Sequence, residues 1–298
     1  MVLRFVDEGC HEVAQAGGKG ASLARMSGFG MPVPPGFVVH ADALAASLPD
    51  GGAELLRAAR EERARAPELV AAAEIGDELR SAVEKAYAEL GEGEHAVAVR
   101  SSACAEDSQE ASFAGQQETY LHVRGADEVL ERLRDCWASF FSERALFYRE
   151  QRGSLDDLGM AVVVQRMVSA DVAGVLFTMD PVQRRRDRMV VEAVFGLGEA
   201  VVSGQVTPDH FLLARDGTVK RERLAVQPLA VVSGSGGGTV ERELSQEEGG
   251  AATLGADELR ELARLGAELE ERLGGPQDIE WALEDGELYV LQCRPVTA

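Results

Sequence analysis

The sequence predicts a mixed α/β protein, and two patterns support this class. Short runs of small and β-branched apolar residues, such as Ala96–Val99 and Met160–Val164, are typical of buried strands. They alternate with longer stretches rich in Ala, Leu, Glu and Arg, such as 51–91, which favour helices. With 298 residues, of which 45% are hydrophobic, the chain can bury the core of one large domain or two modest ones.

The composition argues against several classes of partner. The net charge of -21 repels nucleic acid and anionic membrane surfaces, so we expect neither as a partner. The apolar runs are far shorter than the roughly 18 to 20 residues that span a bilayer, and the N-terminus lacks a secretory leader. The four cysteines are scattered, with neither zinc-ligand spacing nor a disulfide framework. We therefore expect a cytoplasmic protein, unprocessed from Met1, with reduced and mostly buried thiols.

In the first half of the chain, residues 14–40 predict a glycine-rich turn (AGGKG), a helix at Ala21–Met26, a Gly/Pro loop and a strand at Phe37–His40. Residues 51–91 predict two helices with a kink near Ala64–Pro67. Strands are expected at Ala96–Arg100 and Thr119–Val123, joined by a long polar segment, and one core-packing helix at Asp127–Arg149.

The second half is richer in strands. The expected elements are strands at Met160–Met167, Gly174–Thr178 and Met189–Ala193, a flexible glycine-rich loop at Ser233–Thr239, a helix at Asp257–Leu273, and a closing hairpin of Ile279–Leu283 and Leu288–Cys293.

Three places in the sequence carry groups that can bind phosphate. Lys19, one of only three lysines, lies between glycines that allow a ligand to approach closely. Arg100 ends a predicted strand, where a phosphate contact and an ordinary surface arginine are equally favoured by its position. Gly115 lies in a polar loop whose main-chain amides could contact phosphate.

The closing hairpin offers ligands for a divalent cation. Strand alternation brings Glu280, Gln292 and Arg294 toward one polar face. A carboxylate and an amide oxygen suit Mg²⁺, which completes its shell with phosphate oxygens and water. The alternative is a solvated face that carries a Glu/Arg ion pair.

Five blocks of sequence, in order, carry a resemblance to a known family. The chain resembles the N-terminal ATP-binding domain of phosphoenolpyruvate synthase, pyruvate phosphate dikinase and rifampin phosphotransferase, almost from end to end. The blocks are GGKGASLARM with MPVPPGFVV, VRSSACAEDS with SFAGQQETYL, VVVQRMV with AGVLFTMDP, EAVFGLGEAVVSGQVTPD, and GPQDIEWAL with LYVLQCRPV.

The resemblance implies an ATP-grasp-like fold of two lobes that close on ATP, which we place at 1–170 and 171–298. It also implies ligand roles for matching residues: Lys19, Arg100 and Arg294 would hold phosphates, Gly115 and Thr119 would form the loop over them, Gln165 would lie by the adenine, and Glu280 with Gln292 would bind Mg²⁺. Glu199 of the GLGE sequence would line the site, and its role there is not assigned.

The implied reaction converts ATP to AMP and passes a phosphoryl group through a histidine on a swivelling domain, or to a small acceptor. None of the five histidines lies in a Thr-Ser-His-Ala setting, and His122 and His210 are expected to be hydrogen-bonded or at the surface. The carrier would therefore belong to another domain or chain, and this chain would be an excised domain or split subunit. Two alternatives are a free-standing kinase that phosphorylates a metabolite or antibiotic directly, and a noncatalytic nucleotide sensor.

Overall fold

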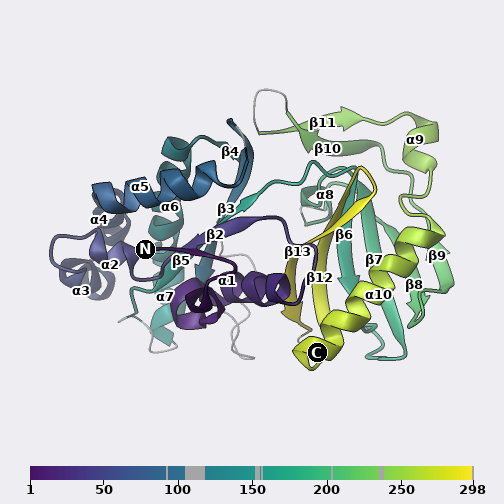
Figure 1. The fold of residues 1–298 in the computed structure, drawn as a ribbon, viewed down its shortest axis with the longest axis horizontal. Coiled ribbons are helices and arrows are strands. Elements are labelled where there is room, and N and C mark those ends of the chain that lie inside the picture. The colour runs from purple at the N-terminus through teal and green to yellow at the C-terminus, as the bar shows by residue number, and fades with distance from the viewer. Residues whose placement is uncertain are drawn as a thin grey trace. The chain divides into compact units, whose positions relative to one another are not determined.

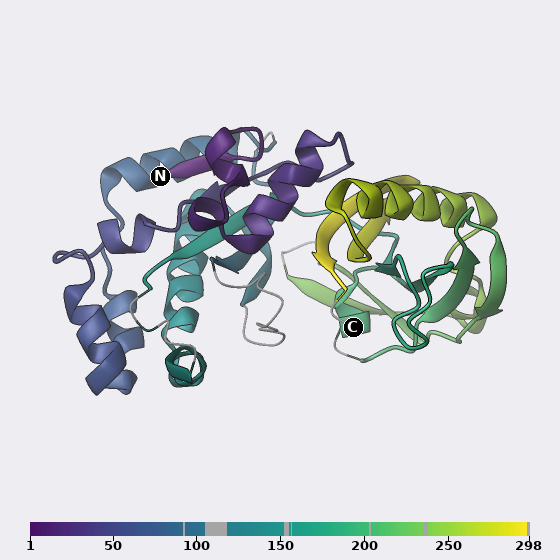
Figure 2. The same cartoon turned by 90° about the horizontal axis from the view of Figure 1, so that it is seen from below.

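The structure is a computed structural model that describes residues 1–91, 93–104, 118–151, 155, 157–202, 204–234 and 238–296. The chain forms two compact units, drawn in Figures 1 and 2. Unit 1 consists of Met1–Gly28 and Pro35–Met167, and unit 2 consists of Phe29–Pro34 and Val168–Ala298. Both units combine helices with antiparallel sheets, which confirms the predicted mixed α/β class.

Unit 1 is built on a five-stranded antiparallel sheet in the order β1-β2-β5-β3-β4. Its elements are β1 (Val2–Arg4), the 3-10 helix η1 (Glu8–His11), α1 (Val13–Gly28), β2 (Gly36–Val39), α2 (Ala43–Ala46), α3 (Ala53–Glu61), η2 (Arg63–Arg65), α4 (Ala66–Ala71), α5 (Asp77–Ala88), β3 (Ala96–Ala103), β4 (Thr119–Arg124), α6 (Ala126–Phe140), α7 (Glu143–Gln151) and β5 (Met160–Arg166).

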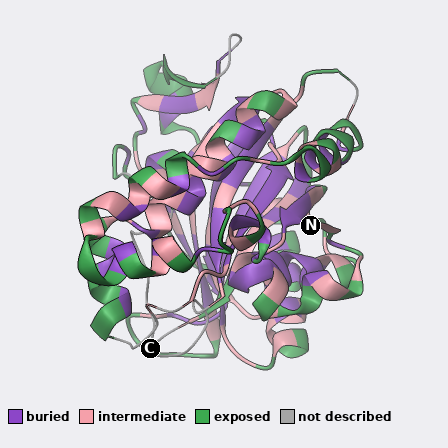
Figure 3. Cartoon of the chain, turned by 90° about the vertical axis from the view of Figure 1, so that its left-hand side faces the viewer, coloured by how far each residue is buried: buried purple, intermediate pink, exposed green. Residues whose placement is uncertain are grey.

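The two faces of this sheet are covered by different helices. Because side chains alternate along a strand, Val97 and Val99 of β3 face the hydrophobic core that contains Trp137 of α6. The opposite face meets α1, where Gly20 approaches Val38 so closely that a Cβ at Gly20 would lie 2.9 Å from a methyl carbon of Val38. Figure 3 shows the buried strands inside and the exposed outer surfaces of the helices.

Unit 2 contains a six-stranded antiparallel sheet in the order β13-β12-β6-β7-β8-β9 and a separate β10-β11 ribbon. Its elements are β6 (Val172–Phe177), β7 (Arg188–Phe195), α8 (Glu199–Val202), β8 (Asp209–Ala214), β9 (Val219–Arg223), β10 (Leu229–Ser233), β11 (Thr239–Glu243), α9 (Gln246–Gly250), α10 (Ala256–Leu273), β12 (Gln277–Glu284) and β13 (Glu287–Pro295). Helix α10 packs on β12 and β6, and Gly266 permits its close approach to Leu176.

Three helix predictions were wrong, one in its starting residue and two in the number of helices. Helix α1 begins at Val13, before the glycine-rich sequence. The single helix expected at 127–149 is two helices, because the chain leaves helical geometry at Phe141, where φ is -106° and ψ is 11°. The segment 51–91 contains three α-helices, because the extended conformation of Gly76 separates α4 from α5.

Among the described residues, no helix has the length and apolar character needed to cross a membrane. All four cysteines are free, three of them are buried, and Cys104 is partly exposed, which confirms that the thiols are mostly buried.

Candidate functional site

The glycine-rich sequence around Lys19 is a kink inside α1. Gly17 has φ 68° and ψ 174°, outside helical geometry. A Cβ at this position would lie 2.0 Å from the main-chain oxygen of Ser102. Only glycine satisfies both the positive φ and this close approach. At the predicted turn, the backbone of α1 is therefore in close contact with the backbone of β3.

Two serines of β3 hold this part of α1. The Ser102 hydroxyl donates to the main-chain oxygen of Ala16 (2.9 Å) and accepts from the main-chain nitrogen of Gly20 (3.2 Å). The Lys19 Nζ donates to the main-chain oxygen of Ser101 at 2.9 Å. A carbonyl group orients the ammonium without neutralising its charge.

The structure brings Lys19 to the strand that carries Arg100. Arg100 of β3 lies directly opposite Thr119 of β4. On the other side of β3, Gln165 of β5 lies opposite Ala98, two residues before Arg100. By strand alternation Arg100 and Gln165 face the same side of the sheet as Ser102, which contacts α1. Gln165 is only 3% exposed. Gly115, the predicted loop residue, lies outside the described residues.

The predicted cation ligands are paired in unit 2. In the β12–β13 register Glu280 lies directly opposite Gln292, and Asp278 lies opposite Arg294. The register shifts between Glu280 and Trp281, immediately after this pair. Three of the predicted residues, Glu280, Gln292 and Arg294, therefore share one face at one end of the hairpin because of this shift. Without it, pairing counted from the turn would set Glu280 opposite Leu291 and Gln292 on the other face.

Arg294 is held by a residue that sequence reasoning did not single out. Its Nε donates to Oδ2 of Asp278 at 2.9 Å, so this arginine's ion pair joins it to Asp278. Burial raises the pKa of Asp278, while Arg294 opposes that rise. The Arg294 side chain is 52% exposed, so its terminal amino groups can reach a ligand while Nε stays bound. The signal in the sequence was the position of Asp278, two residues before Glu280 on the same face.

The hairpin fits a cation that keeps most of its shell from other sources. Glu280 offers a carboxylate and Gln292 an amide oxygen, both from facing strands. Within the described part of the chain, no group of three or more His, Cys, Asp and Glu residues could enclose a metal ion. This donor set suits Mg²⁺, which prefers oxygen ligands and is commonly shared with phosphates and water.

The GLGE segment has a fixed backbone. Gly196 has φ 75°, and a Cβ there would lie 2.2 Å from the main-chain oxygen of Val231. The same oxygen accepts from the main-chain nitrogen of Leu197 at 2.7 Å. Glu199 then begins α8. The structure therefore shows how this segment is held on β10, and the role of Glu199 stays open.

The prediction for His122 was wrong. This residue is buried in β4 with φ 59°, and neither ring nitrogen has a hydrogen-bond partner among the described residues. The register between β3 and β4 shifts between Val97 and Val99, so β4 carries an extra residue there. A β-bulge explains both the positive φ and the buried ring.

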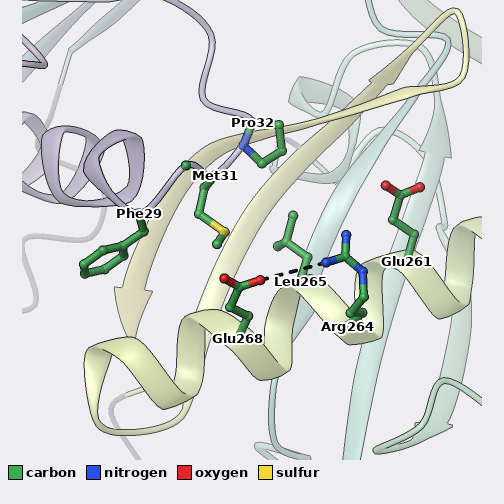
Figure 4. A pocket seen from close by; sticks show the side chains of 8 residues that line it. Phe29, Met31, Pro32, Glu261, Arg264, Leu265 and Glu268 are labelled. Carbon is green, nitrogen blue, oxygen red and sulfur yellow. Dashed lines mark ion pairs between the residues drawn. The ribbon is translucent and has the colours of Figure 1, made fainter.

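A small pocket in unit 2 lies apart from the predicted ligands (Figure 4). The segment Phe29–Pro32 forms one side and α10 the other, and the cavity measures about 110 Å³. Arg264 and Glu268 form an ion pair at its edge (3.9 Å). None of the predicted site residues lines this pocket.

The fold is that of a two-unit α/β protein with antiparallel sheets. The chain belongs to the family described as the pyruvate phosphate dikinase, AMP/ATP-binding domain, whose model matches residues 13–298. This confirms the family resemblance that the sequence blocks indicated.

Named relatives agree with this family. The chain is 41% identical to a probable phosphoenolpyruvate synthase of Methanocaldococcus jannaschii, across 96% of this chain and 26% of the relative. It is 42% identical to a rifampicin phosphotransferase of Streptomyces sp, across 100% of this chain and 36% of the relative. The chain thus spans well under half the length of these relatives. The solved D-alanyl-alanine synthetase A of Vibrio cholerae aligns with 93% of this chain and 57% of its own at 10% identity and a TM-score of 0.36, too distant to support an argument.

Proposed function

We propose that this chain is the ATP-binding part of a dikinase-type phosphotransferase with an ATP-grasp-like fold. It binds Mg-ATP and yields AMP: one of the two phosphoryl groups removed passes to a carrier histidine on another domain or chain, or to a small acceptor, and the other is transferred to water and released as phosphate. The family match over residues 13–298 supports the nucleotide. The greater length of the relatives supports further domains, because the chain covers 26% of one and 36% of another.

The observation that carries the proposal is the cross-strand pair of Glu280 and Gln292 beside Arg294. In this proposal Glu280 and Gln292 hold Mg²⁺, and Arg294 binds phosphate while Asp278 fixes its Nε. The metal supplies charge neutralisation of the phosphates. A hairpin that places a carboxylate, an amide oxygen and a guanidinium at one end can bind a metal-phosphate unit through complementary charges.

In unit 1, Lys19 and Arg100 are the proposed phosphate cations. Thr119, opposite Arg100, and Gly115 are proposed for the loop over the phosphates, and Gln165 for the adenine. The geometry that supports this is the Lys19 contact with the carbonyl of Ser101, the residue that follows Arg100. Two cations at adjacent points can each make a charge-assisted contact with a triphosphate.

Binding of Mg-ATP tests this assignment. We expect Lys19→Ala and Arg100→Ala each to weaken Mg-ATP binding by roughly 10- to 150-fold, because a hydrogen bond to a charged group is worth about 1.5 to 3 kcal/mol. Isothermal titration calorimetry measures the affinity, and circular dichroism checks the fold. Lys85→Ala is the matched control, since it removes the same charge from an exposed position of α5 in the same unit. Wild-type affinity in both site variants would refute the phosphate assignment.

The identity of the product tests the reaction. We expect AMP when the protein is incubated with Mg-ATP and a partner that carries the acceptor histidine, because a dikinase-type site exposes the β-phosphoryl group to its acceptor, whereas a simple kinase transfers the γ-phosphoryl group and leaves ADP. Chromatography resolves AMP, ADP, pyrophosphate and phosphate. ADP as the sole nucleotide product, formed in proportion to a phosphorylated small molecule, would instead establish a free-standing kinase. Binding without any product would favour a nucleotide sensor.

A cytoplasmic location is part of the proposal. It is supported by the four free cysteines, since reduced thiols are typical of that compartment.

A further inference from the structure

We infer that Ser102 is a positioning residue for Lys19: its side chain is built into the kink of α1 and sets where the ammonium of Lys19 points. The inference rests on the proposed phosphate-binding role of Lys19.

The kink of α1 has an unusual hydrogen-bond pattern. In a continuous α-helix the main-chain nitrogen of Gly20 would donate to the main-chain oxygen of Ala16, four residues earlier. Gly17 lies between them with non-helical φ and ψ. The Ser102 hydroxyl bridges the same two groups, because it accepts from Gly20 at 3.2 Å and donates to Ala16 at 2.9 Å. A side chain inserted into the ladder of a helix is a known cause of a kink.

Water cannot readily replace this bridge. Ser102 is 0% exposed, and Ala16 and Gly20 are also buried. Loss of the hydroxyl would leave a buried donor and a buried acceptor without this partner, and each such group carries a desolvation cost. The backbone of α1 around residues 16–20 would then shift to satisfy them.

The bridge is linked directly to the cation. Lys19 lies within the bridged segment, directly before Gly20, and its Nζ reaches the main-chain oxygen of Ser101. Ser101 and Ser102 follow Arg100 without interruption in β3. One strand therefore supplies a proposed phosphate ligand, the carbonyl that orients Lys19 and the hydroxyl that fixes the helix around it. A shift of residues 16–20 moves Lys19 relative to that strand.

A double-mutant cycle tests the inference. The affinity for Mg-ATP is measured by calorimetry for the wild type, Ser102→Ala, Lys19→Ala and the double variant, with thermal denaturation of each. We expect Ser102→Ala to weaken binding by roughly three- to tenfold in the wild type, and by less than about twofold when Lys19 is already absent. Ser102→Cys keeps a weak donor of similar size and should give an intermediate loss.

Ser139→Ala is the matched control. Its hydroxyl donates to the main-chain oxygen of Cys136 at 2.8 Å, within α6 of the same unit. This variant should leave the affinity for Mg-ATP unchanged. If it weakens binding as Ser102→Ala does, the effect of Ser102 is general destabilisation and the inference is overturned.

The outcomes separate the inference from the proposed function. An equal loss from Ser102→Ala with and without Lys19, or no loss in either background, overturns the inference alone, provided that Lys19→Ala weakens binding. Wild-type affinity of Lys19→Ala overturns the proposed role of Lys19 and the inference with it. If Ser102→Ala does not fold, Ser102→Cys is carried through the same cycle, and equal losses in the two Lys19 backgrounds overturn the inference.

Discussion

The Lys19 region and the β12–β13 hairpin place their ligands by different means. In the hairpin, Glu280 and Gln292 meet because two adjacent strands pair around the turn at Asp285–Gly286 with a one-residue register shift after Glu280. In the Lys19 region, the contacts join α1 to β3 across more than 80 residues of sequence, as between Ser102 and Ala16. The first arrangement follows from local strand pairing, and the second exists only after the sheet has formed.

This difference has a consequence for substitutions. A hairpin ligand can be changed with little effect on the fold, because Glu280 and Gln292 are partly exposed. The Lys19 region depends on buried backbone contacts, in which Gly17, Ser102 and Gly20 are all buried. We therefore expect substitutions there to affect stability and ligand affinity together, and hairpin substitutions to affect metal use alone.

The largest effect is expected for Gly17→Ala. The new Cβ would meet the main-chain oxygen of Ser102 at 2.0 Å, at a φ of 68°. We expect a loss of about 2 to 5 kcal/mol in the free energy of unfolding, from backbone strain and overpacking together, and a marked loss of Mg-ATP affinity. Chemical denaturation and calorimetry measure the two quantities.

Gly51→Ala is the control for Gly17→Ala, because Gly51 has a φ of 65° but a Cβ added there would meet nothing within 4 Å. It should lose only about 1 to 2 kcal/mol, the cost of a left-handed conformation. Equal losses in the two variants would show that contact with β3 contributes nothing at Gly17.

An intermediate effect is expected for Glu280→Gln. An amide donates less charge to a hard cation than a carboxylate, so the Mg²⁺ concentration at half-maximal ATP binding should rise on the order of tenfold. Gln292→Ala should act in the same direction by a smaller factor. The measurement is a Mg²⁺ titration of ATP binding, with chemical denaturation to show that stability is unchanged.

Glu287→Gln is the control in the same hairpin, since this carboxylate is exposed at the start of β13 and accepts from the hydroxyl of Tyr289. Its Mg²⁺ titration should match that of the wild type. If the Mg²⁺ titrations of Glu280→Gln and the wild type superimpose, Glu280 is not a ligand of the metal.

The smallest effect is expected for His122→Asn, which changes a buried side chain of unit 1 that carries no proposed ligand role. Burial, and then the charge of Arg124, lowers the pKa of His122. The folded state therefore binds this proton less readily than the unfolded state, and stability is lost as pH falls below about 6.5, the ordinary histidine value. Asparagine tolerates the positive φ of 59° and does not titrate.

For this variant we expect the free energy of unfolding to depend less on pH below about 6.5, by up to one proton or about 1.4 kcal/mol per pH unit. Denaturant unfolding between about pH 5 and 7.5 measures the slopes. The wild type, measured over the same pH range, is the reference. Identical slopes for His122→Asn and the wild type would contradict a buried neutral ring.

Much of the fold could be predicted because its signals are local. Strands β3, β5 and β12 were found from runs of apolar residues, and α10 from its helical periodicity. The break at Phe141 could not be found, because the apolar spacing continues on both sides of it. The start of α1 at Val13 was missed because glycines normally interrupt helices, whereas here β3 supports the interruption.

The sequence by itself determined the family and the mixed α/β class, and a short turn between two apolar runs indicated the closing hairpin. Only the tertiary structure decided the register shift that pairs Glu280 with Gln292 rather than with Leu291. It also decided that Asp278 holds Arg294 and that Ser102 bridges the kink beside Lys19. The second contact joins positions 86 residues apart. No local pattern specifies such a contact, because it depends on how a helix packs against a completed sheet and on which buried backbone groups then lack a partner.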